Sequence, residues 1–146
     1  MNFKDCKSCF ACKAKGNKTN GICAIRDDLR PVLEKIHEAN AVVIGSPAYY
    51  GDLTGEAFSV IHRMLFAPMH YEDDGSRDEL LPVKKKCGLI VTMNATEDMI
   101  RKGYDRYFQN TADMIGMVFG RCETLYACDT YQFDDYSKPS RNRRSG

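Results

Sequence analysis

Ala41-Val42-Val43-Ile44-Gly45-Ser46-Pro47-Ala48-Tyr49-Tyr50-Gly51 is the stretch that decides the fold of this chain of 146 residues. It joins a run of apolar residues to an aromatic segment bounded by glycine and proline. Strands that are apolar on both faces are typical of parallel sheets covered by helices. In such sheets, ligands bind beyond the carboxyl ends of the strands. We therefore expect a buried strand over 41–45 and a binding loop directly after it.

Helix and strand patterns alternate along the rest of the chain. Strands are predicted over 87–92 and 124–128, and residues 69–77 are predicted to form a loop. Apolar residues at helical spacing predict three helices. These positions are Leu29, Val32, Leu33 and Ile36 in the first helix, Ala57, Phe58, Ile61, Met64 and Leu65 in the second, and Ile100, Tyr104, Tyr107, Phe108, Ala112, Ile115 and Val118 in the third.

Residues near the ends of these helices predict where each begins or stops. Asp27 and Asp28 are expected to cap the first helix, and Asp52 or Thr54 the second. The third follows Thr96, and Gly120 is expected to end it. His62 and Arg63 fall off the apolar stripe of the second helix. The order of helix, strand, helix, strand, helix, strand predicts an α/β fold with a parallel sheet of about three strands.

Composition limits the function classes. The chain has 21 basic and 20 acidic residues, and its one dense basic run is 141–144, so nucleic acid is not expected as a partner. The sequence shows no apolar segment of signal-peptide or membrane-spanning length, so we expect a cytoplasmic protein that does not bind membranes. Seven cysteines in a reducing compartment point to metal or redox chemistry rather than to disulfides.

Cysteines are concentrated near the amino terminus, at Cys6, Cys9, Cys12 and Cys23. Two successive steps of C-x2-C are similar to the run that wraps a [4Fe–4S] cluster, because closely spaced thiolates can converge on one centre. Ten residues separate Cys12 from Cys23, which is a long spacing for the fourth ligand. Three interpretations stay open: a cluster, a zinc site and unligated thiols.

Together, Cys6–Cys12, Asp27-Asp28-Leu29 and Gly45–Asp52 resemble the flavodoxin-like family of NADPH-dependent FMN reductases and iron-sulfur flavoproteins. The resemblance extends to about residue 136, which predicts a partial flavodoxin-like domain over 1–136 and a polar, basic tail over 137–146. Family members begin with a strand, a phosphate loop and a helix, and they end in a further helix. This sequence lacks both parts. A three-layer sandwich would therefore have one face of its sheet bare.

A bare sheet face is costly. We expect about four large apolar side chains on either face, such as Val42, Ile44, Leu89 and Val91, each worth roughly 1.5–3 kcal/mol on burial. The sequence therefore predicts either a fragment of a longer product or a chain completed by self-association as a homo-oligomer.

The resemblance implies that FMN lies along the loop after the first strand, in contact with Ser46, Pro47, Ala48, Tyr49, Tyr50 and Gly51. Thr92, Met93 and Asn94 would line the other edge of the flavin ring. Because hydride moves directly between nicotinamide and flavin, no catalytic acid or base is expected. The alternative is a plain strand-to-helix turn. Without the phosphate loop, the ring contacts alone predict weak FMN binding.

Three functions stay open at this point. The first is a flavin-dependent oxidoreductase or electron carrier that passes electrons from NAD(P)H, as co-substrate, to a small acceptor. The second is a [4Fe–4S] electron-transfer flavoprotein that uses Cys6, Cys9, Cys12 and Cys23. The third is a non-enzymatic, truncated subunit that only associates with another chain.

Overall fold

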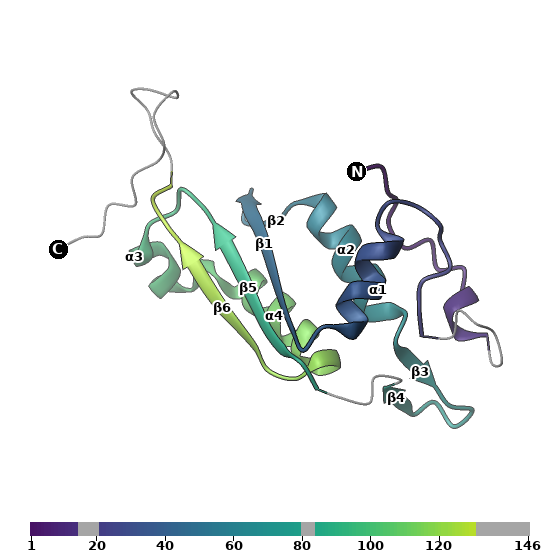
Figure 1. The fold of residues 1–146 in the computed structure, drawn as a ribbon. Coiled ribbons are helices and arrows are strands. Elements are labelled where there is room, and N and C mark those ends of the chain that lie inside the picture. Colours follow the sequence, from purple (N-terminus) through teal and green to yellow (C-terminus); the bar gives the residue numbers. More distant parts are fainter. Residues whose placement is uncertain (15–20, 80–83, 131–146) are drawn as a thin grey trace.

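The computed structural model describes residues 1–14, 21–79 and 84–130 (Figure 1). Its main sheet has four strands in the order β2-β1-β5-β6. β1 (Ala41–Tyr49), β5 (Lys86–Thr92) and β6 (Cys122–Ala127) are parallel, and β2 (Asp52–Leu53) is antiparallel to β1. The prediction of an α/β fold with three parallel strands is therefore confirmed, with one short antiparallel strand added at the edge.

The register of the parallel strands brings their carboxyl ends together. Pro47 on β1 lies opposite Thr92 on β5, and Thr92 lies opposite Ala127 on β6. The segments that follow β1 and β5 therefore leave the sheet at the same end. β1 also extends further than expected, because it continues beyond Gly45 to Tyr49 and turns back into β2.

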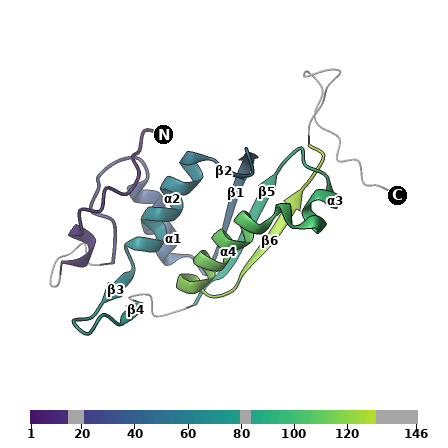
Figure 2. The same ribbon diagram turned by 180° about the vertical axis from the view of Figure 1, so that it is seen from behind.

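Helices alternate with the strands. α1 (Arg30–Glu38) precedes β1, α2 (Gly55–Phe66) follows β2, and α4 (Arg106–Phe119) leads into β6. Shorter elements complete the described chain: the 3₁₀ helix η1 (Ala11–Lys13), the hairpin of β3 (Met69–Tyr71) and β4 (Arg77–Glu79), α3 (Glu97–Met99) and the π-helical turn η2 (Ile100–Tyr104). Seen from behind, α4 crosses one face of β5 and β6 (Figure 2).

One hydrophobic core lies between the helices and the covered face of the sheet. Leu89 and Val91 on β5 are fully buried there, together with Leu33 of α1, Ile61 of α2 and Phe108 of α4. The four residues expected to be divided between the two faces, Val42, Ile44, Leu89 and Val91, all lie on this covered side.

The other face of the sheet has no helix over it among the described elements (Figure 1). Alternation along β1 places Val43 on this face, and Val43 is 66% exposed. Leu125 on β6 is 61% exposed. The bare face that the sequence predicts is therefore present in the described part of the molecule.

The expected helix ends are partly right. Thr54 caps α2, because its Oγ1 accepts a hydrogen bond from the Ala57 amide at 3.2 Å. Gly120 ends α4 with φ of 107°. Asp27 and Asp28 do not cap α1, whose N-cap is Leu29 without a side-chain bond. The Asp28 carboxylate instead accepts the Asn2 amide, and the Asp27 carboxylate accepts the amides of Lys4 and of Leu29.

Three other expectations need correction. The predicted loop over 69–77 contains the short strand β3 and the first residue of β4, and the two strands pair as a hairpin. The predicted long third helix is broken at Gly103, whose φ of 89° interrupts the helical backbone. Arg63 does not lie on an exposed helix face, because only 1% of its surface is accessible. The expected tail, 137–146, lies outside the described residues.

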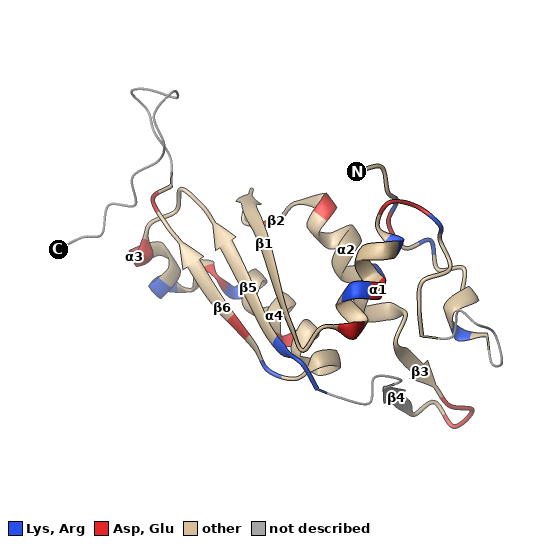
Figure 3. Cartoon of the chain, in the orientation of Figure 1, with Lys and Arg blue, Asp and Glu red and all other residues tan. Residues whose placement is uncertain are grey.

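Charged residues are distributed over most elements of the described chain (Figure 3). Among the described residues, no helix is both long and apolar enough to cross a membrane.

Candidate functional site

The segment after β1 forms a two-residue hairpin turn. β1 and β2 pair Tyr49 with Asp52, which leaves Tyr50 and Gly51 at the turn. Both have left-handed backbones, with φ of 54° and 84°, as in the type I′ turn that suits hairpins. Glycine adopts this conformation freely, whereas another residue pays about 1–2 kcal/mol. Tyr50 is fully exposed, so no packing of its ring offsets that strain.

The buried side chain of Ser46 stabilises the segment around this turn. Its side chain is buried, with the residue 4% exposed. Its Oγ accepts a hydrogen bond from the Thr54 amide at 3.1 Å and donates to the Pro47 carbonyl at 2.9 Å. The hydroxyl therefore holds the end of β1 against the beginning of α2. Of the predicted ring-contacting residues, Ser46 uses its side chain inside the protein, whereas Pro47, Tyr49 and Tyr50 are exposed and Ala48 and Gly51 are half-buried.

The segment after β5 shows the same division of roles. Thr92 and Asn94 are exposed at the carboxyl end of the sheet, whereas the Met93 side chain is buried. The Met93 amide donates to the Ala127 carbonyl at 2.9 Å, and its carbonyl accepts from the Thr130 amide at 3.1 Å. Met93 therefore anchors the segment, and its two neighbours face outward.

Tyr104 was missed by the sequence analysis as a residue of this region. The pattern places it on the apolar stripe of a long helix, but the break at Gly103 moves it to the end of η2. A Cβ built on Gly51 would lie 3.5 Å from the Tyr104 hydroxyl. The Tyr104 hydroxyl therefore lies beside the hairpin turn. Gly103, within the first turns of the predicted helix, was the one sequence feature that could have indicated the break.

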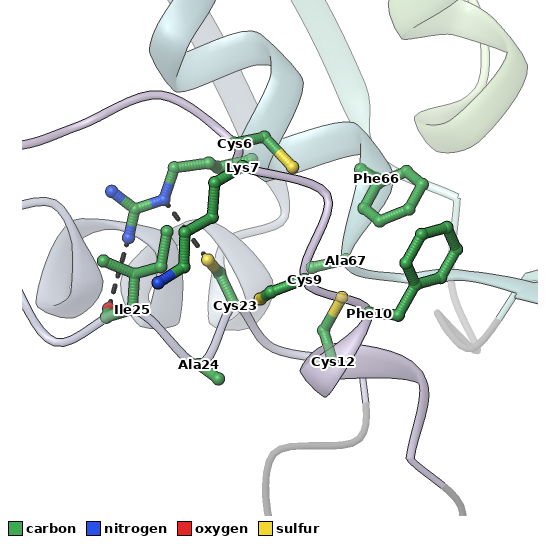
Figure 4. Close-up of a pocket in the computed structure, with 11 residues that line it drawn as sticks. Cys6, Lys7, Cys9, Phe10, Cys12, Cys23, Ala24, Ile25, Phe66 and Ala67 are labelled. Carbon is green, nitrogen blue, oxygen red and sulfur yellow. Dashed lines mark hydrogen bonds between the residues drawn. The ribbon is translucent and has the colours of Figure 1, made fainter.

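The amino-terminal cysteines meet at a second place. Cys6, Cys9, Cys12 and Cys23 line one small pocket against Phe66 and Ala67, at the end of α2 (Figure 4). Cys12 and Cys23 are buried, Cys6 is half-buried and Cys9 is exposed. Left-handed backbones at Ser8 and Phe10, with φ of 51° and 55°, bend the chain tightly between the cysteines. The structure thus brings together all four predicted ligands, including Cys23.

Arg63 organises this region from α2. Nε donates to Cys23 Sγ at 3.3 Å, and the two terminal nitrogens pair with the Asp27 carboxylate at 2.7 and 3.0 Å. The same two nitrogens donate to the carbonyls of Lys4 and Ile25. The Arg63 guanidinium holds the pKa of Asp27 below its ordinary value. The five N–H groups of this arginine therefore all have partners in one buried network.

Lys13 ties the cysteine segment to the same helix. Its Nζ donates to the carbonyls of Phe66, Ala67 and Met69, just where α2 ends. A lysine is favourable there because the free carbonyls of a helix carry partial negative charge. The ammonium also lies 4.3 Å from the centre of the Phe66 ring. Burial lowers the pKa of Lys13.

Four thiols are the donor set of a [4Fe–4S] cluster, but their spacing here is not that of a site for a single ion. Among residues 1–14, 21–79 and 84–130, no three His, Cys, Asp or Glu side chains are grouped closely enough to hold one metal ion. Zinc bonded to four thiolates at about 2.3 Å would need such a tight group. The pocket between the cysteines has a volume of about 10 Å³, the space of roughly one water molecule. A cluster therefore needs more room between the four thiols than this structure shows.

Cys87, Cys122 and Cys128 differ from the amino-terminal group. Cys87 on β5 is buried, and its Cα partner across the sheet is Cys122. Burial raises the pKa of all three thiols, that of Cys122 to about 11. Protonated thiols of this kind are poor ligands and nucleophiles, so these three residues contribute to packing rather than to a metal site.

The hairpin turn and the cysteine pocket lie at opposite ends of α2. Thr54 precedes the helix beside the turn, and Phe66 ends it beside the cysteines. A helix of 12 residues is about 18 Å long. Within one chain, the two candidate sites are therefore separate.

Comparison with solved structures defines the class of fold. The FMN-dependent NADH-azoreductase of Bacillus anthracis, solved with FMN, has a TM-score of 0.53 at 16% identity, covering 73% of this chain and 52% of that one. The NAD(P)H:quinone oxidoreductase of Methanothermobacter marburgensis has a TM-score of 0.54 at 17% identity, covering 75% and 59%. These likenesses show a flavodoxin-like fold, of which this chain spans roughly half to three fifths of either neighbour.

Sequence comparison shows the family. The family model for NADPH-dependent FMN reductases matches residues 3–104, and the chain belongs to this family. An iron-sulfur flavoprotein of Archaeoglobus fulgidus is 44% identical over 67 residues, which are 46% of this chain and 30% of the relative. One from Methanocaldococcus jannaschii is 33% identical over 58 residues, 40% and 28% of the two chains. The chain thus matches less than a third of the length of these relatives.

Proposed function

We propose that this chain acts as an FMN-dependent oxidoreductase that passes electrons from NAD(P)H to a small acceptor. The observation that carries the proposal is the strained, exposed Tyr50-Gly51 turn at the carboxyl end of a parallel sheet. In α/β sheets, ligands bind at this edge. Membership of the FMN reductase family and the FMN and NAD(P)H named for two structural neighbours support the choice of cofactor and donor.

In this proposal the exposed residues at the turn and at the segment after β5 hold the flavin ring. Tyr49 and Tyr50 supply aromatic surface, which suits a flat ring. Thr92 and Asn94 offer polar groups at the other edge, while Ser46 and Met93 fix the two backbones from inside the protein. When bound, FMN supplies the hydride acceptor. The chain's own task is to place and orient the ring.

An FMN titration of the purified chain tests this assignment. Because the proposed contacts involve only the ring, we expect a dissociation constant weaker than micromolar. Oxidation of NAD(P)H should depend on added FMN. Submicromolar affinity in the absence of a partner would place the site elsewhere, and no binding with no NAD(P)H oxidation would favour the non-enzymatic subunit.

A [4Fe–4S] cluster on Cys6, Cys9, Cys12 and Cys23 is the second proposed function. All four thiols line one pocket, and two relatives are named iron-sulfur flavoproteins. When bound, the cluster would supply one-electron chemistry. Anaerobic purification followed by iron and sulfide analysis tests this proposal. Four irons and four sulfides per chain are expected. The absence of both from an anaerobically reconstituted sample would contradict the cluster proposal.

We further propose that a second copy of this chain covers the bare sheet face, and that residues 1–136 act as one domain. Val43 on β1 and Leu125 on β6 are large, apolar and more than half exposed on that face, on either side of β5. Burial of such side chains contributes roughly 1.5–3 kcal/mol each. We also propose a cytoplasmic location, where seven cysteines would stay reduced.

A further inference from the structure

Arg63 is the most deeply buried charged residue of the described chain, and the proposed flavin site does not use it. It lies on α2, nine residues beyond Thr54, and 1% of its surface is exposed. Arginine is rarely buried to this extent without a specific set of partners. Its partners Asp27 and Cys23 beside the cysteine pocket account for this burial.

The geometry of the Arg63 network fixes one N–H group in a defined direction. Four of the five N–H groups bind the Asp27 carboxylate and two backbone carbonyls, those of Lys4 and Ile25. The planar guanidinium cannot rotate without breaking these bonds. The fifth group, on Nε, is consequently held toward Cys23 Sγ at 3.3 Å (Figure 4).

This contact differs from those of the nearby lysines. Lys13 directs its ammonium to carbonyls at the end of α2, and Lys7 lies at the rim of the pocket with an exposed side chain. The Asp27 carboxylate also offsets the charge of Arg63. The ion pair of Arg63 and Asp27 has no net charge. It therefore offers Cys23 a fixed hydrogen-bond donor and not an uncompensated positive charge.

We propose that Arg63 is a positioning residue that fixes Cys23 as the fourth ligand of the [4Fe–4S] cluster and raises its reduction potential through the Nε–H···Sγ bond. This inference rests on the cluster proposed above. Reduction from the 2+ to the 1+ state adds one electron, which increases the negative charge on the ligating sulfurs. A fixed donor stabilises the reduced state more than the oxidised state, and hydrogen bonds to sulfur are a recognised means of setting such potentials.

The test compares wild type with two variants as full chains, each reconstituted anaerobically with iron and sulfide. The double variant Arg63→Met with Asp27→Asn has the net charge of wild type but no donor to Cys23. Asp27→Asn alone retains the donor and removes the ion pair. Reductive titration with dithionite, followed by electron paramagnetic resonance, measures the midpoint potential. We expect a more negative potential in the double variant and no negative shift in Asp27→Asn.

A measurement on wild type covers the case in which the double variant does not fold. Protein labelled with ¹⁵N-arginine is reduced, and hyperfine spectroscopy detects nitrogen and exchangeable hydrogen close to the cluster. We expect coupling to one arginine N–H, and its absence would overturn the inference. Equal potentials in loaded wild type and loaded double variant would also overturn the role of Arg63 while leaving the cluster intact. A wild type that binds neither iron nor sulfide overturns both proposals.

Discussion

Tyr50 combines a left-handed backbone with full exposure, a pairing that costs stability and gains no packing in return. Tyr50→Asn should raise the free energy of unfolding by about 1 kcal/mol, because asparagine tolerates this backbone conformation better than tyrosine. The same substitution should weaken FMN binding, since it removes an aromatic surface. Chemical denaturation and FMN titration measure the two effects.

Tyr50→Phe is the matched control for this prediction. It retains both the ring and the backbone strain, so stability and FMN binding should stay close to those of wild type. If Tyr50→Asn were more stable than wild type and bound FMN equally well, the strain would have no connection to the flavin site.

Asp27 makes the stability of the folded protein depend on pH in the acid range. Its folded-state pKa is lowered, chiefly by hydrogen bonds from Arg63, so its stabilising contribution is present above the unfolded pKa of about 3.9 and is lost as the pH falls through the lower folded value. Asp27→Asn leaves a buried arginine without its counter-charge and should cost about 3–5 kcal/mol at pH 7.

The stability difference between wild type and Asp27→Asn should therefore be largest at neutral pH and should shrink below pH 4. Urea denaturation at a series of pH values measures it. Asp28→Asn is a suitable comparison, since Asp28 accepts an amide hydrogen bond from Asn2 but has no bond to Arg63. A difference that stayed constant down to pH 2 would mean that the ion pair contributes nothing to stability.

At the scale of single residues, apolar periodicity predicted burial well and polar roles less well. Leu29, Leu33 and Ile61 are buried as expected, because the helical repeat marks the face that meets the core. Arg63 was misassigned, since its burial depends on Asp27 and Cys23, which come from a different part of the chain. No local pattern reveals partners that are 36 and 40 residues away.

Gly55 and Gly103 provide a test of the break in the predicted third helix, because both have space for a Cβ and only one has a left-handed backbone. A Cβ on either Gly55 or Gly103 meets no atom within 4 Å, but Gly103 alone has a left-handed φ, of 89°. Gly103→Ala should therefore cost about 1–2 kcal/mol. Gly55→Ala, at the start of α2, should be neutral or stabilising by up to about 1 kcal/mol. Thermal unfolding of both variants gives the comparison, and equal effects would contradict the break.

Lys13 provides a test of how the cysteine segment is attached to α2. Lys13→Met removes hydrogen bonds to the carbonyls of Phe66 and Met69 and should cost about 1–3 kcal/mol. Amide hydrogen exchange in the segment around Cys12 should become faster. Lys7→Met, an exposed position in the same segment, should change neither. Unaltered exchange in Lys13→Met would show that other contacts hold the segment.

At the scale of elements, strands and helices were located correctly where their repeats were long and uninterrupted. The three parallel strands and α1, α2 and α4 follow directly from their patterns. The hairpin of β3 and β4 was missed because strands of three residues are too short to show alternation. Likewise, the apolar stripe continued across Gly103, so periodicity alone did not locate the break.

For the whole molecule, the bare sheet face predicts association in solution. Wild type should show concentration-dependent dimerisation in analytical ultracentrifugation, and Val43→Lys with Leu125→Lys should shift it to the monomer. Met117→Lys is the control, since Met117 is an exposed apolar residue on α4, which covers the other face. A wild type that remained a compact, cooperatively melting monomer at all concentrations would contradict this proposal.

The same helix supports both candidate sites, because Thr54 caps the start of α2 and Arg63 lies nearer its other end. One residue inserted between them would rotate everything beyond the insertion by about 100° and shift it by about 1.5 Å. Arg63 would then leave Cys23 and face another direction, while the hairpin turn stayed in place. The number of residues in α2 therefore sets the relative position of the two sites. Substitutions along the helix can preserve this position, whereas an insertion or a deletion cannot.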